Sequence, residues 1–342
     1  MNRCKRCGIS TAVPGIVLDG EGLCNLCIKH DTIHNEDIRD YAKSMLDEVR
    51  SHRGDGSYDA IVCLSGGKDS SYALEQTVKT FGLRALAFTL DNGFLSDYAV
   101  NNIHAVVDAL GVDHVMVRPN KKVYKEIVRV SATKKIYNIQ TLRRISSVCQ
   151  SCITMVINSA VSLAIEKRAP MVIGGFTLGQ VPRGRFGYEL APKMLNQMRA
   201  DTVAKFNEHT SPDISRYLLI DRHHEASEFT PRLLNPLCAV EIDEAGIVAA
   251  VKKLGWQQPT DVDGCSSNCR LNAFANHAHE KRYGYNPYEL ELADLVRRGL
   301  LEREQMIAKI TDTVDAVREE IAKELELDAG TEFVPAAAAS RQ

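Results

Sequence analysis

The sequence predicts an α/β protein with an open parallel sheet and helices on both faces, preceded by a small cysteine-rich module and followed by a helical C-terminal region. Two observations predict the central sheet. Short β-branched runs alternate with longer helical segments between residues 55 and 190. These runs are apolar throughout rather than alternating, which is typical of strands covered on both faces.

Two elements are expected before this sheet. Residues 1–30 carry four cysteines with little apolar periodicity, which indicates a metal-stapled module rather than a hydrophobic unit. In the linking segment 31–54, apolar residues recur at spacings of three and four, so we expect an amphipathic helix over 33–53. Glycines at 54 and 56 end this helix.

The pattern then predicts the remaining elements in order. The strands expected within residues 55–190 are 60–65, 85–91, 114–119 and 171–175. The helices expected between them are 70–79, 97–110 and 152–167. Residues 191–327 are mainly helical in pattern, and residues 328–342 are expected to be a disordered tail.

Composition sets the broad class. The chain has 342 residues, of which 44% are hydrophobic and 25% charged, so it can bury a full core. A net charge of −2 excludes a protein that coats nucleic acid through its whole surface. There is no apolar run of eighteen residues and no apolar stretch in the opening MNRCKRCGIS, so we expect a cytoplasmic protein without a membrane span.

One segment is locally basic. Residues 118–144 hold nine lysines and arginines against a single acid, Glu126. This asymmetry fits a solvated helix face. It also fits a surface for a phosphorylated substrate, from a nucleotide sugar to tRNA.

The segment that runs from strand 60–65 into the next helix carries the hexapeptide SGGKDS. Its glycines, Gly66 and Gly67, let the backbone turn tightly and approach an anion, and the helix N-terminus offers unpaired N–H groups. Further donors are Lys68 and the hydroxyls of Ser65, Ser70 and Ser71. The alternative is a plain strand-to-helix turn.

This hexapeptide resembles the pyrophosphate-binding loop of the PP-loop ATP pyrophosphatases, which have a HUP-type α/β fold and cleave ATP between its α- and β-phosphates. The resemblance implies that Mg²⁺ accompanies the nucleotide and that Lys68 and Asp69 serve the chemistry. It implies an adenosine site near Asp91, although an aspartate at a strand end is also a common turn former. The nucleotide-binding set implied is Ser65, Gly66, Gly67, Lys68, Asp69, Ser70, Ser71, Asp91 and Gly175.

The ten cysteines fall into two groups and two single residues. Cys4, Cys7, Cys24 and Cys27 have the C-x2-C, sixteen residues, C-x2-C spacing of a tetrahedral Zn²⁺ site. A closed shell of four sulfurs leaves no position open for catalysis, so we expect a structural zinc. The alternative is four unrelated buried thiols.

The second group consists of Cys149 and Cys152, followed by Cys265 and Cys269. In PP-loop sulfurtransferases that thiolate tRNA, a C-x2-C pair at this place and one later cysteine hold a 4Fe-4S cluster. The resemblance implies the ligands Cys149, Cys152 and Cys265, with Cys269 as the competing third or a fourth ligand. Zinc, a cysteine persulfide and simple packing remain alternatives.

The two ends of the chain resemble a second PP-loop group, the N-acetyl sugar amidotransferases, which use ammonia from a glutaminase partner. The opening CKRCGISTAVPGIVLDGEGLCNLC and the region NHAHEKRYGYNPYELELADLVRRGLLEREQMIAKI carry this resemblance. After strand 171–175, moreover, this chain has FTLGQ where tRNA thiolases have a histidine and paired acids. A small carbonyl-bearing substrate is therefore favoured over tRNA, and Arg183 and Arg185 either grip its phosphate or carboxylate or lie in a solvated loop.

The first hypothesis is an ATP-dependent sulfurtransferase that adenylates a carbonyl oxygen and replaces it with sulfur from a cluster or persulfide. The second is an amidotransferase that converts an acetamido to an acetamidino sugar. The third is a non-catalytic nucleotide-binding module. A sulfur donor or a glutaminase would be the partner, and the oligomeric state stays open, with a homodimer as one form.

Overall fold

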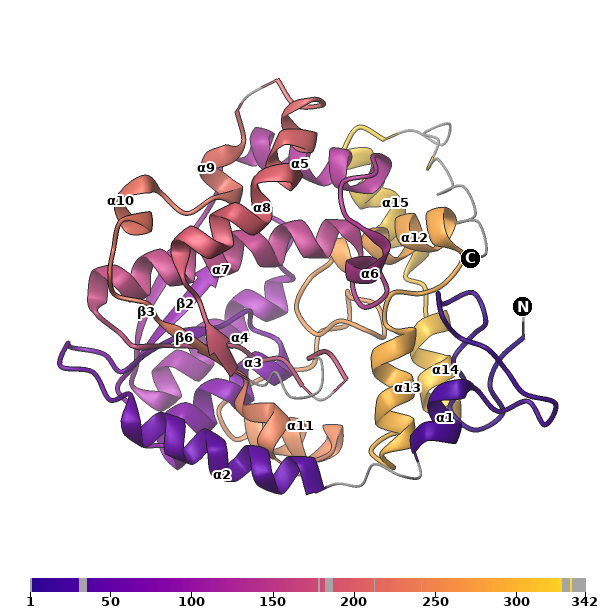
Figure 1. The fold of residues 1–342 in the computed structure, drawn as a ribbon, viewed down its shortest axis with the longest axis horizontal. Helices are drawn as coiled ribbons and strands as arrows, with labels where there is room; N and C mark the ends of the chain where they lie inside the picture. Colours follow the sequence, from indigo (N-terminus) through magenta and orange to yellow (C-terminus); the bar gives the residue numbers. More distant parts are fainter. Residues whose placement is uncertain are drawn as a thin grey trace.

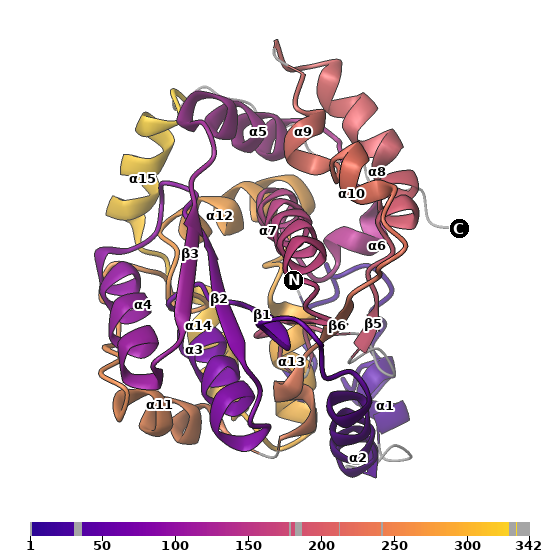
Figure 2. The ribbon, with the colours of Figure 1, turned by 90° about the vertical axis from the view of Figure 1, so that its left-hand side faces the viewer.

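Six strands form one sheet in the computed structural model, in the order β3-β2-β1-β4-β6-β5 (Figures 1 and 2). The first five in this order are parallel, and β5 runs antiparallel to β6. The structure describes residues 2–30, 36–177, 179–181, 187–211, 213–240, 242–327 and 333. The strands are β1 (Ala60–Cys63), β2 (Ala85–Leu90), β3 (Asp113–Val117), β4 (Met171–Ile173), β5 (Gly187–Glu189) and β6 (Arg232–Leu234).

The four predicted strands are present, with two differences from expectation. β3 is not covered on both faces, because it lies at the sheet edge and leaves Met116 and Val117 partly exposed. The region after residue 190, expected to be mainly helical, contributes β6, which pairs with β4. At three residues, β6 and β5 are too short to give a period-two signal.

Helices cover both faces of the sheet (Figure 2). One face packs against α5, α7 and α12, and the other against α2, α3, α4 and α11. The helices on the first face and at its margin are α5 (Lys121–Thr133), α6 (Ile139–Leu142), α7 (Ser147–Lys167), α8 (Pro192–Asn207), α9 (Ser215–Leu218), α10 (Arg222–Glu225), α12 (Leu271–Tyr283) and α15 (Asp315–Glu324). Those on the second are α2 (Glu36–Ser51), α3 (Lys68–Glu75) with the π-helical η1 (Gln76–Thr80), α4 (Asp97–Leu110), α11 (Glu244–Lys252) and the 3-10 helix η2 (Pro236–Ala239).

The predicted helices are confirmed with shifted ends. The linking helix is α2, the second predicted helix matches α4, and the third, α7, begins five residues earlier than expected. Its first turn therefore includes Cys149. The final tail lies outside the described residues apart from Phe333.

α7 is long and apolar enough to cross a membrane by length and composition, but half of its apolar window is buried inside the protein. It packs on β1, β2 and β4 and on helices α5, α9 and α12. Its apolar character is therefore accounted for by the core.

The basic segment forms α5, the short helix α6 and the turns beside them. Lys121 and Lys125 both pair with Glu324, at 2.9 and 3.3 Å, and Arg129 pairs with Glu326 at 2.9 Å. These contacts attach α15 and the turn that follows it to α5. Part of the positive charge is thus neutralised within the chain.

The N-terminal cysteine module packs against two C-terminal helices, α13 (Glu289–Arg297) and α14 (Arg303–Thr311), as Figure 1 shows. It includes the short helix α1 (Asn25–His30). Gly8 lies so close to α14 that a Cβ at this position would be 2.8 Å from the Met306 sulfur, and its φ of +77° also favours glycine. The N-terminal module and these two helices therefore build one unit with its own apolar cluster.

Candidate active site

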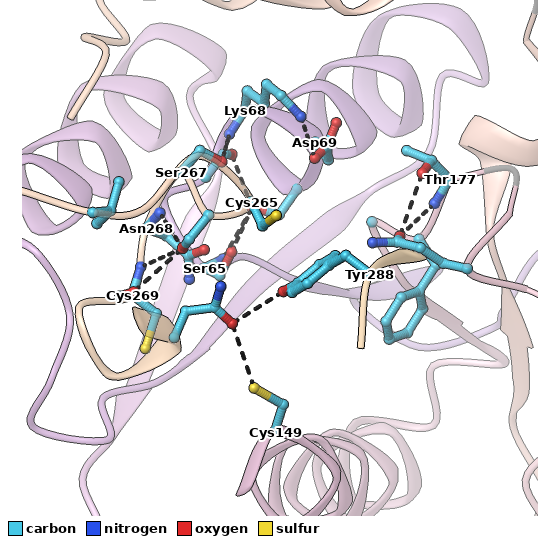
Figure 3. Close-up of a pocket in the computed structure, with 18 of the residues that line it drawn as sticks. Ser65, Lys68, Asp69, Cys149, Thr177, Cys265, Ser267, Asn268, Cys269 and Tyr288 are labelled. Carbon is cyan, nitrogen blue, oxygen red and sulfur yellow. Dashed lines mark hydrogen bonds and ion pairs between the residues drawn. The ribbon is translucent and has the colours of Figure 1, made fainter. Parts of the chain in front are cut away.

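A cavity of about 830 Å³ lies at the carboxyl ends of β1 and β4 (Figure 3). The strand order reverses between these two strands, and open α/β sheets bind ligands at such crossover points. The volume is near the upper end of the range for small-molecule pockets, about 300–1,000 Å³. The cavity therefore has room for a nucleotide and a second small molecule.

The loop between β1 and α3 is fixed by close backbone contacts. Gly66 has φ +77°, and a Cβ there would lie 2.2 Å from the Ala99 carbonyl oxygen of α4. The Gly66 carbonyl accepts hydrogen bonds from Trp256 Nε1 at 2.9 Å and Asn102 Nδ2 at 3.3 Å. A Cβ at Gly175, just after β4, would lie 2.8 Å from Ser70 Cα. Only glycine fits at either position without moving the backbone.

Serine hydroxyls shape the same loop. The Ser65 N–H donates to Ser70 Oγ at 3.1 Å, and Ser70 Oγ donates to the Gly67 carbonyl at 3.1 Å. The helix N-cap, Gly67, has no side-chain cap, so the first N–H groups of α3 are available to an acceptor. One of them, Lys68 N–H, donates to Ser267 Oγ at 3.2 Å. An anion oxygen could replace this hydroxyl.

Lys68 carries the positive charge of the loop. Its Nζ lies 2.7 Å from Asp69 Oδ2 and 3.6 Å from Glu244 Oε1 at the start of α11. Burial opposes its charge, but Asp69 and Glu244 outweigh burial and raise its pKa. Glu244 also pairs with Lys309 of α14 at 3.1 Å. Lys68 therefore stays protonated and can neutralise phosphate charge.

Glu291 of α13 is a buried carboxyl that lines the cavity. Burial and the nearby Asp69 charge together raise its pKa to about 8, against the lowering effects of Gln180, Lys68 and Arg144. At neutral pH this carboxyl is mostly protonated and can act as a hydrogen-bond donor. The remaining Asp69 oxygen, Oδ1, is buried and has no hydrogen-bond partner among the described residues.

The predicted nucleotide-binding residues separate into two sets. Those that line the cavity are Ser65, Gly67, Lys68, Asp69, Ser70 and Gly175. Those that do not line it are Gly66, Ser71 and Asp91. Gly66 acts through backbone shape, and Ser71 is fully buried. Asp91 accepts the Gly93 N–H at 2.8 Å and pairs with Arg118 at 3.2 Å, the bonding expected of a turn former.

Three cysteines meet at the other end of the cavity. Cys149 and Cys152 lie one turn apart near the start of α7, and Cys269 lies in the segment before α12. The Asn92 amide, Nδ2, is 3.7 Å from both Cys152 Sγ and Cys269 Sγ. Cys149 Sγ donates to Asn272 Oδ1 at 3.6 Å, an oxygen that also accepts the Tyr288 hydroxyl at 3.0 Å. Burial raises the pKa of Cys149 and of Cys269 to about 12.

Cys265, favoured from the sequence as the third ligand, lies elsewhere in the cavity. Its Sγ donates to the Lys309 carbonyl of α14 at 3.4 Å, whereas the Asn92 amide contacts Cys152 and Cys269. Of the two cysteines, Cys269 is the one that shares the Asn92 amide with Cys152. Spacing could not decide this, because the turn at residues 265–269 determines which thiol faces α7.

The separation of these thiols bears on the metal. Among the described residues, the only group of three or more candidate ligands within 4.8 Å of one another is Cys4, Cys7, Cys24 and Cys27. The second cysteine group does not meet this single-ion spacing. A cluster distributes its cysteine ligands over separate irons, so a wider spacing suits it better than zinc.

The N-terminal thiols fit a single tetrahedral ion. Cys4 Sγ lies 3.7 Å from Cys27 Sγ, and Cys7 Sγ lies 3.7 Å from Cys24 Sγ. Thiolates about 2.3 Å from a tetrahedral ion are about 3.8 Å apart. All four are buried, and the Cys24 N–H donates to Cys4 Sγ at 3.3 Å, as expected for thiolate ligands.

Several cavity residues were not predicted. They come from a region whose sequence predicted only mainly helical structure: Glu244, Asn272, Glu291 and Lys309 lie in helices, and Tyr288 directly precedes α13. The predicted pair Arg183 and Arg185 lies outside the described residues. Residues 176, 177 and 180 of the FTLGQ segment do line the cavity, and none of them is an acid or a histidine.

Comparison with known proteins gave weak matches. No protein-family model matches the chain. It is 23% identical over 251 residues to the uncharacterized protein MJ1599 of Methanocaldococcus jannaschii, covering 73% of this chain and 71% of that protein.

Two solved structures also resemble the chain. The U34-tRNA thiolase NcsA from Methanococcus maripaludis, with its 4Fe-4S cluster, has a TM-score of 0.37 and 16% identity over 100% of this chain and 94% of its own. The NMN synthetase from Francisella tularensis has a TM-score of 0.38 and 13% identity over 86% of this chain and 96% of its own.

A substitution that removes one thiol tests whether the cysteine module binds a structural metal. Cys4→Ser should remove one bound zinc per chain and lower the Tm by about 5 °C or more, because the module and α13–α14 share one apolar cluster. Metal analysis and thermal unfolding measure these effects. The matched control is Cys238→Ser, also at a buried cysteine but outside both sites, which should retain the zinc. Equal zinc content in the two variants would contradict the assignment.

Glu291→Gln should change how stability depends on pH. The pKa of Glu291 rises from 4.5 to about 8 on folding, so the wild type loses stability as pH increases between these values. The unfolding free energy of the variant minus that of the wild type should therefore increase by about 1.4 kcal/mol for each pH unit of increase. Urea unfolding between pH 5 and 8 measures it. Glu304→Gln, at an exposed glutamate, is the control, and a pH-independent difference for Glu291→Gln would refute the shift.

Proposed function

We propose that the chain is a PP-loop ATP pyrophosphatase that adenylates a carbonyl oxygen of a small substrate and replaces that oxygen with sulfur. The observation that carries this proposal is the SGGKDS loop at the crossover between β1 and β4, at one end of a cavity whose other end holds three cysteines. Nucleotide chemistry and thiol chemistry would thus share one cavity.

The loop supports binding of the ATP phosphates. The N–H groups at the start of α3, of which Lys68 N–H donates to Ser267 Oγ, and the Lys68 ammonium group would face the pyrophosphate portion. Asp69, with its unpartnered Oδ1, is the residue suited to Mg²⁺, which would neutralise phosphate charge. These groups stabilise the negative charge that develops as pyrophosphate leaves.

The chemistry follows from this arrangement. The substrate carbonyl oxygen bonds to the α-phosphorus, and the bond between the α- and β-phosphates breaks. A sulfur nucleophile then adds to the activated carbon, and AMP leaves with the former carbonyl oxygen. The residues of the chain supply position and charge, and the Glu291 carboxyl is a proton donor within the same cavity.

The three cysteines suit an iron–sulfur cluster. Cys149, Cys152 and Cys269 would be its ligands, and a cluster bound by three cysteines leaves one iron free to carry sulfur. The Asn92 amide would donate to two of the three ligand sulfurs. Because burial keeps the thiols protonated, loading the cluster would release protons.

Nitrogen insertion is the second candidate. Both regions that resemble N-acetyl sugar amidotransferases take part in the architecture, the first as the cysteine module and the second as α12, α13 and α14. The absence of an acid or histidine at residues 176, 177 and 180 also departs from the tRNA thiolases. In this case ammonia from a glutaminase would replace sulfur, and the second cysteine group would hold no cluster.

Asp69→Ala should abolish ATP-dependent release of pyrophosphate while the fold remains intact, because it removes the carboxylate suited to Mg²⁺ beside the phosphates. A pyrophosphate assay and circular dichroism measure this. Asp97→Ala provides the control, since Asp97 occupies the first turn of α4 as Asp69 does in α3. Unchanged turnover in Asp69→Ala would refute the assignment of the loop.

Anaerobic purification distinguishes sulfur insertion from nitrogen insertion. The wild type should be brown, with about four irons and four sulfides per chain. Cys269→Ser should lose most of this iron, whereas Cys265→Ser should retain it, because Cys265 lies beside Lys309 rather than Asn92. A colourless wild type containing only zinc would exclude the cluster and favour ammonia. If only Cys265→Ser lost the iron, Cys265 rather than Cys269 would be the third ligand, as expected from the sequence.

A further inference from the structure

The helix α13 packs beside the cysteine module (Figure 1), and it also lines the cavity. The cavity is lined by Tyr288, which precedes the helix, and by Glu291, Leu292 and Leu295. These positions are three, four and seven residues apart, so they form one stripe along the helix. One face of α13 is therefore a wall of the cavity.

The opposite face is attached to the module. The Glu289 carboxylate is buried and accepts hydrogen bonds from Nη1 and Nη2 of Arg3, at 3.1 and 3.3 Å. It also accepts the Ser10 N–H at 2.8 Å. Positions two apart on an α-helix are separated by about 200°, so Glu289 and Glu291 point in nearly opposite directions.

A second contact attaches the far end of α13. Arg297 donates from Nη1 to the Cys7 sulfur at 3.5 Å and pairs with Asp294 at 3.0 Å. Arg297 thus contacts a predicted metal ligand directly. The two attachment points lie near the first and last residues of the helix.

A helix of this size depends on its packing. α13 has nine residues, fewer than an isolated helix needs to be stable in water. Its apolar residues belong to the same cluster as the four module cysteines. The position of α13, and hence of Glu291, therefore depends on a correctly folded module.

We propose that the cysteine module positions the cavity carboxyl Glu291 by holding α13, with Glu289 and Arg297 as positioning residues. The metal ion suited to Cys4, Cys7, Cys24 and Cys27 would thus support the active site as well as the local fold. The link between module and helix is independent of the reaction, whereas its effect on nucleotide binding rests on the proposed function.

Glu289→Gln tests the link without nucleotide. The variant keeps the shape and one accepting oxygen but removes the charge that faces Arg3. Amide hydrogen exchange in α13 should become about fivefold faster or more, with metal content unchanged. The matched control is Asp59→Asn, because Asp59 is an equally buried carboxylate bound to Arg84 at the opposite end of β1. Unchanged exchange in α13, or the same increase in the control, would overturn the proposal.

A double-mutant cycle tests the consequence for the cavity. Affinity for a non-hydrolysable ATP analogue is measured for the wild type, Glu289→Gln, Glu291→Gln and the double variant. Since Glu289 and Glu291 face opposite sides, non-additive effects would report transmission through α13. Additive effects would overturn the proposal. If the wild type does not bind the analogue, the proposed function fails instead, and hydrogen exchange alone decides whether the module holds α13.

Discussion

The site depends on the close approach of three backbone segments at the carboxyl ends of β1 and β4. Gly66 contacts Ala99 of α4, and Gly175 contacts the first turn of α3 near Ser70, with no space for a Cβ at either glycine. This approach opens the N-terminus of α3 toward the cavity and fixes its direction relative to the sheet. Everything else in the cavity is arranged around this helix end.

The remaining walls come from distant parts of the chain. The start of α7 brings Cys149 and Cys152, the segment before α12 brings Cys269, and α13 brings Glu291. Figure 3 shows Cys149 and Cys269 among these residues. The central domain alone therefore forms only part of the cavity. The C-terminal helices, which in turn pack against the N-terminal module, complete it.

Local features were predictable, whereas long-range ones were not. The glycine turn between β1 and α3, its flanking elements and the tetracysteine module depend on short spacings, which a sequence displays directly. The choice between Cys265 and Cys269 depends on how one turn packs against α7 and α14, contacts that lie more than 40 residues away in sequence. Strand β6 and the cavity role of Glu291 are equally non-local, because β6 has three residues and Glu291 lies in an ordinary amphipathic helix.

The contacts of the loop between β1 and α3 connect the two ends of the cavity. Ser267 Oγ occupies the Lys68 N–H, while Asp69 and Glu244 occupy the Lys68 ammonium group. A phosphate bound at the loop would compete with these groups for the same donors. Ser267 is two residues from Cys269, and Glu244 also pairs with Lys309, whose carbonyl accepts the Cys265 thiol. Under the proposed function, nucleotide binding would therefore act on the segment that carries both C-terminal cysteines.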